Sequence, residues 1–168
     1  MPLDTKRLTK LALLTAVSLI LFTVEAQLPA PVPIPGVKLG LANIITVYAM
    51  FAYGPRDTLI ILLIRVFLGS VFAGAMVTLL YSLGGGLLCF VLMLLLRRLV
   101  TEKQLWVCSV LGAAAHNLGQ TVVAFALFRS WAVAAYLPLL LLSGMIAGAF
   151  TGLCAQFLLA RLNRLRQK

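Results

Sequence analysis

The sequence has 168 residues, of which 62% are hydrophobic and only 11% are charged, and its mean hydropathy is +1.09. Water-soluble domains are about a quarter charged, and a domain of this size has too little interior to bury so much apolar surface. The composition therefore excludes a water-soluble fold and predicts a protein embedded in a membrane.

The formal net charge of +10 comes from 14 Lys and Arg residues against 4 Asp and Glu residues. The bases stand at the ends of apolar runs, where they set the topology and contact anionic membrane lipid. No basic stripe with interleaved aromatic residues occurs, so a nucleic-acid partner is not expected. Cys89, Cys108 and Cys154 lie far apart in apolar segments, which predicts packing residues and neither a disulfide framework nor a metal site.

Six apolar stretches follow one another along the chain, each at or near the roughly 20 residues that a helix needs to cross a bilayer. The proline-rich segment 29–35 ends the first stretch, and the Gly54-Pro55 pair ends the second. Arg97 and Arg98 end the fourth. The sequence therefore predicts an all-α membrane bundle in a single transmembrane domain, 1–168, with six helices at residues 8–27, 37–53, 56–74, 76–96, 105–128 and 133–162.

The positions of the bases also predict the orientation of the bundle. With an inner N-terminus, nearly all of the 14 Lys and Arg residues lie on the inner side, and only Lys38 and Arg129 lie on the outer side. This asymmetry predicts a multi-pass protein of the cell membrane with both termini in the cytoplasm. The alternative for the first stretch is a cleaved signal peptide, because residues 24–26 resemble a cleavage site, but Glu25 and the prolines that follow also suit the outer end of a retained helix.

Polar side chains within the apolar stretches are the functional candidates, because burying them requires partners or a watery cavity. Most of them fall in the outer half of the membrane, which predicts a cavity that opens outward. His116 and Gln120 share a helix face, although such residues also serve to bond one membrane helix to another. The predicted substrate-binding residues are Lys38, Asn43, Arg65, Tyr81, His116, Asn117 and Gln120, with Glu25 near the mouth of the cavity and Ser82 beside Tyr81.

Arg65 is the most informative of these residues, because it lies near the middle of the third stretch without an obvious acidic partner at its own depth. Three interpretations remain open from the sequence. The guanidinium pairs with Glu25, or it donates to backbone carbonyls, or it holds an anionic group on a ligand, for which its geometry is well suited.

Small residues recur every four positions on two of the stretches, a spacing that lets membrane helices approach closely. Gly144, Gly148 and Gly152 predict packing within the bundle. The sequence has no nucleotide-binding loop of the G-x-x-x-x-G-K-[ST] type, no Asp-rich pair for diphosphate chemistry and no H-E-x-x-H motif. We therefore expect no catalytic residue, metal or cofactor, and any ATP-driven work requires another subunit.

Five segments, taken in order, resemble the Gx transporter family, which is also labelled heptaprenyl diphosphate synthase component I. They are KLGLANI at 38–44, YGPR at 53–56, RVFLGS at 65–70, YSLGGG at 81–86 and HNLGQ at 116–120. That family is similar to the substrate-capture subunits of energy-coupling factor (ECF) transporters, six-helix proteins that bind micronutrients in an outward-facing pocket. The resemblance implies that Ala12 and Ala16 dock onto a transmembrane coupling protein that two ATPases drive.

Two hypotheses of function follow, with a purely structural bundle as a third. The preferred one is a non-enzymatic membrane subunit that binds a small organic micronutrient for uptake. The other, implied by the synthase label, is a non-catalytic membrane accessory of isoprenoid or quinone biosynthesis that presents or anchors a lipid precursor.

Overall fold

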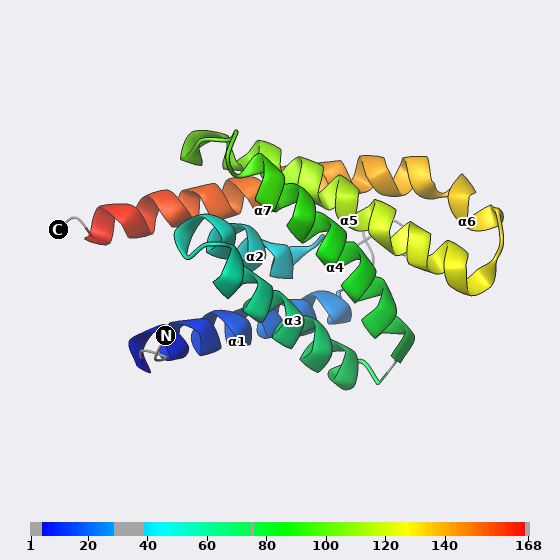
Figure 1. Ribbon diagram of the computed structural model, residues 1–168, viewed down its shortest axis with the longest axis horizontal. Helices are drawn as coiled ribbons and strands as arrows, with labels where there is room; N and C mark the ends of the chain where they lie inside the picture. Colours follow the sequence, from blue (N-terminus) through cyan, green and yellow to red (C-terminus); the bar gives the residue numbers. More distant parts are fainter. Residues whose placement is uncertain (1–4, 29–38, 75, 167–168) are drawn as a thin grey trace.

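A computed structural model describes residues 5–28, 39–74 and 76–166, and all regular elements in these ranges are helices. Figure 1 shows the long helices running in alternating directions, so that the described chain begins and ends at the same end of the molecule. The elements are α1 (Thr5–Gln27), α2 (Leu41–Ala52), α3 (Pro55–Phe72), α4 (Met76–Leu96), the short 3-10 helix η1 (Glu102–Gln104), α5 (Leu105–Phe128), α6 (Ala132–Ala135) and α7 (Leu137–Arg166).

The helix bounds can be compared with those expected from the sequence. The helices expected at 76–96 and 105–128 have these bounds in α4 and α5. The last expected helix is divided, because α6 ends at Ala135 and α7 begins at Leu137, with Pro138 in its first turn, where a missing N–H is tolerated. The second helix begins only at Leu41, after Gly40 in a left-handed conformation with φ 72°.

Four helices are long and apolar enough to cross a membrane: Thr5–Gln27, Val77–Leu96, Glu102–Phe128 and Leu137–Leu165. The other two expected spans differ from these. α2 has only 12 residues, and α3 has 18 residues but carries Arg56, Asp57 and Arg65. By length and composition, the described ranges therefore hold four candidate spans of a multi-pass membrane protein.

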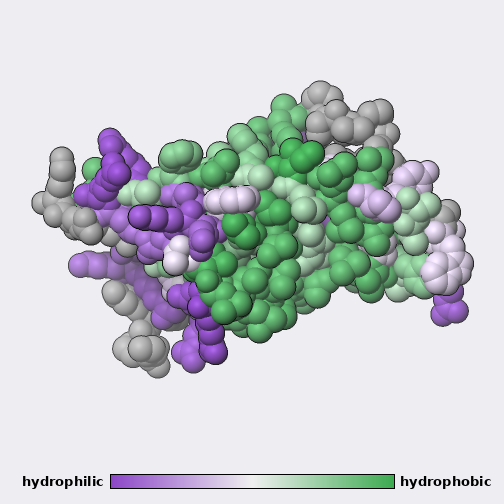
Figure 2. Space-filling model, turned by 90° about the horizontal axis from the view of Figure 1, so that it is seen from above, coloured by the Kyte–Doolittle hydropathy of each residue, from purple (hydrophilic) through white to green (hydrophobic). Residues whose placement is uncertain are grey.

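The surface shows where water and lipid meet this bundle. In Figure 2 a broad hydrophobic surface occupies the middle of the molecule, and hydrophilic residues gather at the end where the described chain begins and ends. Two connections meet at that end, since the guanidinium of Arg97, after α4, lies beside Gly54, between α2 and α3. The charge asymmetry of the sequence is thus an asymmetry between the two ends of the structure.

Glycines bring α5 close to both of its neighbours, α4 and α7. A Cβ atom added at Gly119 of α5 would lie 2.5 Å from the carbonyl oxygen of Gly84 on α4. On α7, a Cβ atom at Gly148 would lie 2.9 Å from the carbonyl oxygen of Ser109, and one at Gly152 would lie 2.7 Å from Cα of Trp106. The packing role predicted for the α7 glycines is confirmed.

α2 is the most enclosed helix, since it contacts α1, α3 and α7 and most of its residues are buried. The hydroxyl of Ser18 on α1 donates to the carbonyl oxygen of Ala42 at 3.2 Å, which fixes the first turn of α2 against α1. Neighbouring protein therefore shields this short helix from lipid along most of its length.

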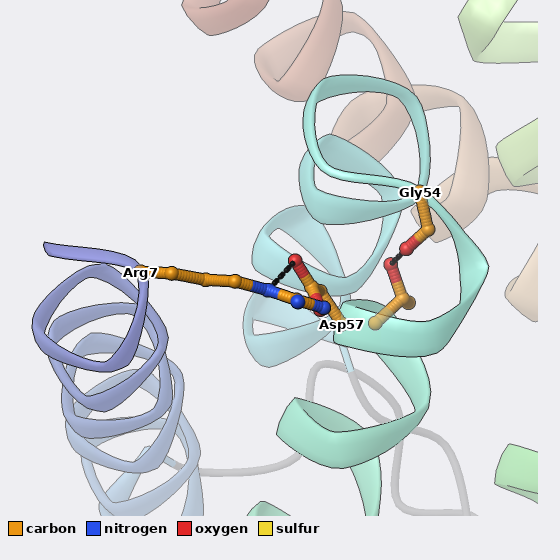
Figure 3. Close-up of polar contacts among 4 residues, drawn as sticks. Arg7, Gly54 and Asp57 are labelled. Atoms are coloured by element: carbon orange, nitrogen blue, oxygen red, sulfur yellow. Dashed lines mark hydrogen bonds and ion pairs between the residues drawn. The ribbon is translucent and has the colours of Figure 1, made fainter. Parts of the chain in front are cut away.

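An ion pair joins α1 to α3 at the end of the bundle where the described chain begins (Figure 3). The guanidinium of Arg7 donates to both carboxylate oxygens of Asp57, which lies in the first turn of α3 and is 5% exposed. In the same turn, the hydroxyl of Thr58 donates to the carbonyl oxygen of Gly54 at 2.9 Å. The side chain of Arg7 is 40% exposed, so the carboxylate depends on this pair more than the guanidinium does.

We expect the two partners of this ion pair to differ in their importance for stability. Arg7→Ala leaves a buried carboxylate without its counter-charge, whereas Asp57→Asn leaves a cation that can reach water. The unfolding temperature in detergent should therefore fall more in R7A than in D57N, and R7A/D57N should recover part of the loss. K10A, which removes an exposed cation of the same helix, is the control; equal losses in R7A and K10A would contradict the role of the pair.

We also expect Gly148→Ala to destabilise the bundle by about 1–3 kcal/mol, because the added methyl group meets backbone atoms of α5 that cannot move aside. Gly86→Ala is the matched control, since its methyl group meets only the flexible end of Leu62, at 3.2 Å, and both changes bring the same gain in helix propensity. Chemical unfolding in mixed micelles measures both variants. A loss of similar size in G86A would show that contact with α5 is not the cause.

Candidate functional site

A cavity of about 100 Å³ lies inside the bundle, lined by residues from α1, α2, α3, α4, α5 and α7. A single water molecule requires roughly 10–15 Å³ on the same measure, so the cavity has room for more than isolated waters. Its polar and charged lining residues are Glu25, Asn43, Arg65, Ser82, Ser109, His116, Asn117, Gln120 and Thr151.

The structure gathers most of the predicted site residues around this cavity. Lys38 lies outside the described residues, and Tyr81 is not among the lining residues, whereas its neighbour Ser82 is. Those that line the cavity are Glu25, Asn43, Arg65, His116, Asn117 and Gln120. That they bind substrate stays a prediction.

Arg65 enters the cavity wall from the inward face of α3 and is only 7% exposed. Its Nη1 and Nη2 atoms both lie 3.5 Å from Oδ1 of Asn43 on α2, beyond the usual range for a strong hydrogen bond. Its Nε atom is buried, and no acceptor for it occurs in the described part of the chain. Among the described residues, therefore, a single amide oxygen holds the guanidinium, at long distance.

Glu25 makes no direct ion pair with Arg65 among the described residues, although it is near enough for an electrostatic interaction. Its Oε1 atom accepts from the amide of Gly40 at 2.6 Å, and its Oε2 atom accepts from the amide of Leu41 at 2.8 Å. The carboxylate thus caps the N-terminus of α2, where free amides and the helix dipole favour an anion. Of the three interpretations of Arg65, pairing with Glu25 and donation to backbone carbonyls are both absent among the described residues.

α5 contributes three polar residues within five positions, His116, Asn117 and Gln120, and their surroundings differ. Asn117 donates through Nδ2 to the carbonyl oxygen of Leu140 on α7, so it bonds two helices as well as lining the cavity. His116 and Gln120 face the glycines of α4, since a Cβ atom at Gly85 would lie 3.0 Å from Cε1 of His116 and 2.8 Å from Cγ of Gln120. The close approach of α4 and α5 therefore holds these two side chains in the wall.

The remaining wall is largely apolar, and part of it carries sulfur. Cys89 and Met93 lie on one face of α4 with their sulfur atoms 3.5 Å apart. Deeper on α5 and α7, the hydroxyls of Ser109 and Thr151 are hydrogen-bonded to each other at 3.2 Å. The described ranges contain no group of three or more His, Cys, Asp or Glu side chains that could hold a metal ion.

Some lining residues were not singled out as site candidates from the sequence. Gly144 and Gly148 of α7 line the cavity as well as packing on α5, and Phe22 contributes an aromatic ring from α1. The glycine spacing gives a packing signal but no indication of a cavity behind it. For Phe22, only the helical phase relative to Glu25, three residues later, points to the same face.

The comparisons with known proteins agree with this architecture. The family model described as heptaprenyl diphosphate synthase component I matches residues 14–158. The chain belongs to this family. The resemblance to the Gx transporter and component I family that the sequence motifs predict is thereby confirmed.

The fold of this component I family member is similar to that of a solved structure described as the S component of a bacterial ECF transporter. The TM-score is 0.70 with 18% sequence identity, and the match covers 97% of this chain and 98% of that chain. No curated protein matches the sequence. The family name refers to a synthase component, whereas the fold is similar to that of a protein described as a transporter S component.

The different surroundings of Asn117 and Gln120 lead to a stability prediction. Asn117→Ala removes the bond to α7 and should cost about 0.6–1.7 kcal/mol, the range for side-chain hydrogen bonds between membrane helices. Gln120→Ala removes an amide without a hydrogen bond in the described residues and should cost less. Unfolding in mixed micelles with increasing denaturing detergent compares the two, and a greater loss in Q120A would contradict the assignment.

Proposed function

We propose that this chain is the substrate-binding membrane subunit of an ECF-type uptake transporter and that its cargo is a small organic micronutrient. The observation that carries the proposal is the cavity, in which a loosely held guanidinium and the side chains of Asn43, His116 and Gln120 share a mostly apolar wall. Such a lining, with few polar groups among many apolar ones, is typical of small-molecule sites. The similarity of the whole chain to an S component supports the same function.

In this proposal six helices, α1 to α5 and α7, lie in the membrane. α3 supports this, because its charged residues Asp57 and Arg65 face inward, whereas the exposed face carries large apolar side chains. Phe67 and Phe72 on that face are 58% and 68% exposed. A helix with this distribution is stable against lipid, because Asp57 and Arg65 have protein around them and the exposed Arg56 lies in its first turn, at the end of the helix.

The base-rich end of the bundle is the cytoplasmic end, by the positive-inside rule. The cavity then opens outward, since the first turn of α2 and the last turn of α1, which bring Gly40 and Glu25 to it, lie toward the opposite end. A nutrient would enter from outside and rest against Arg65, Asn43 and the α5 residues.

A coupling protein would dock on α1. Ala12 and Ala16 are exposed on this helix, beside the exposed residues Leu13 and Ile20, so the small side chains leave a shallow surface for a second membrane helix. The proposal therefore requires a transmembrane coupling protein and two ATPase subunits as partners, because the chain has no nucleotide-binding loop.

The family name favours a second function, a membrane accessory of prenyl-chain synthesis. It predicts a different partner, a soluble prenyl synthase. Capture of partners in mild detergent from cells that express both sets of proteins separates the two functions. We expect the tagged chain to recover a coupling membrane protein with its ATPases; recovery of the prenyl synthase alone would overturn the transporter proposal.

The docking surface can be tested in the same capture. Ala12→Leu and Ala16→Leu fill the shallow surface on α1 and should lower recovery of the coupling protein severalfold without changing the unfolding temperature. Ala126→Leu, at an exposed position of α5, is the matched control and should recover as much partner as the unmodified chain. Full recovery with A12L/A16L would remove α1 from the interface.

A further inference from the structure

The charges that line the cavity limit the kind of cargo it can hold. Among its described lining residues, Arg65 and Glu25 carry permanent charges of opposite sign. Their surroundings differ greatly. Arg65 is buried, and its described contacts are the two long ones to Asn43, whereas each oxygen of Glu25 accepts a short hydrogen bond from a backbone amide.

Glu25 also occupies a place that an anionic ligand would otherwise prefer. The amides of Gly40 and Leu41 at the start of α2 form an anion-binding position, and the carboxylate of Glu25 fills it. A second anionic group on a ligand would therefore meet the negative charge of Glu25, which already accepts from the amides of Gly40 and Leu41. One anionic group, by contrast, finds the guanidinium of Arg65.

We propose that the cargo is a small organic molecule with a single anionic group, which accepts hydrogen bonds from Arg65, and with neutral or hydrogen-bond-donating groups toward Glu25. This inference rests on the proposed function and gives its substrate class. We expect phosphate monoesters, diphosphates and dicarboxylates to bind more weakly, because their further negative charge would lie beside Glu25 in a low-dielectric cavity, whose described lining residues include no second permanent cation.

The test exposes the purified full-length chain to ultrafiltered yeast extract as a mixture of small molecules. The protein is washed and denatured, and the released molecules are identified by mass spectrometry with their charge at neutral pH. We expect the released organic molecule to be a monoanion. Release of water-soluble inorganic ions alone, or of nothing, would overturn the proposed function together with this inference, whereas a neutral molecule or a dianion would overturn only the inference.

Variants of Arg65 test the contact itself. In Arg65→Gln the amount of captured molecule should fall by about tenfold or more, the loss expected for hydrogen bonds to a charged group. Arg129→Gln makes the same change at an exposed position and should capture as much as the unmodified chain. Arg65→Lys keeps the charge and should retain part of the binding if R65Q fails to fold. Capture by folded R65Q as great as by R129Q would overturn the contact. Where R65Q does not fold, capture by R65K as great as by R129Q would do the same.

Glu25→Gln tests the weaker binding of dianions through a gain of binding, which misfolding does not produce. Its amide oxygen still accepts one bond from the start of α2, but its negative charge is gone. We expect E25Q to capture dianionic molecules from the same extract that the unmodified chain leaves behind. An unchanged set of captured molecules would show that Glu25 does not limit the charge of the cargo.

Discussion

The cost of enclosing a guanidinium in an apolar bundle governs much of this structure. Arg65 lies 7% exposed among helices whose outer surfaces are hydrophobic, and an arginine in such surroundings requires acceptors within the protein or on a ligand. α3 turns Asp57, Thr58, Arg65 and Ser70 inward, and its exposed face carries large apolar residues such as Phe67 and Phe72. The cavity lies on the inward side of this helix, where Asn43 offers one weak acceptor and leaves donors for another.

Close helix contacts determine where the rest of the cavity wall can be. The backbones of α4 and α5 nearly touch at Gly84 and Gly119, and the glycines of α7 bring it equally close to α5. With α5 held between two neighbours, the polar residues on its inward face have little freedom to turn away. Thus the same small residues that stabilise the bundle also fix His116 and Gln120 in the wall.

The sequence predicts the gathering of polar residues better than it predicts their partners. Residues at one depth in a membrane bundle meet, so Asn43, Arg65 and the α5 cluster could be assigned to one cavity from topology alone. The capping of α2 by Glu25 and the pairing of Arg7 with Asp57, 50 residues apart, depend on loop paths and helix rotation that no local pattern encodes. The break between α6 and α7 could not be predicted from the sequence either. Pro138 falls in the first turn of α7, where proline suits a helix, so it does not by itself mark a break.

The two functions considered for this family place the ligand at opposite ends of the molecule. A diphosphate head group carries more than one negative charge, which the cavity cannot balance with Arg65 while Glu25 lies beside it. Bases that could balance it lie at the end where the described chain begins and ends: Arg97 lies beside Gly54, and Arg161 and Arg164 lie in the last turns of α7. A role in holding a prenyl diphosphate would therefore use that base-rich surface and leave the cavity unexplained. The proposed capture of a small monoanion, by contrast, gives the cavity and its buried cation a common purpose.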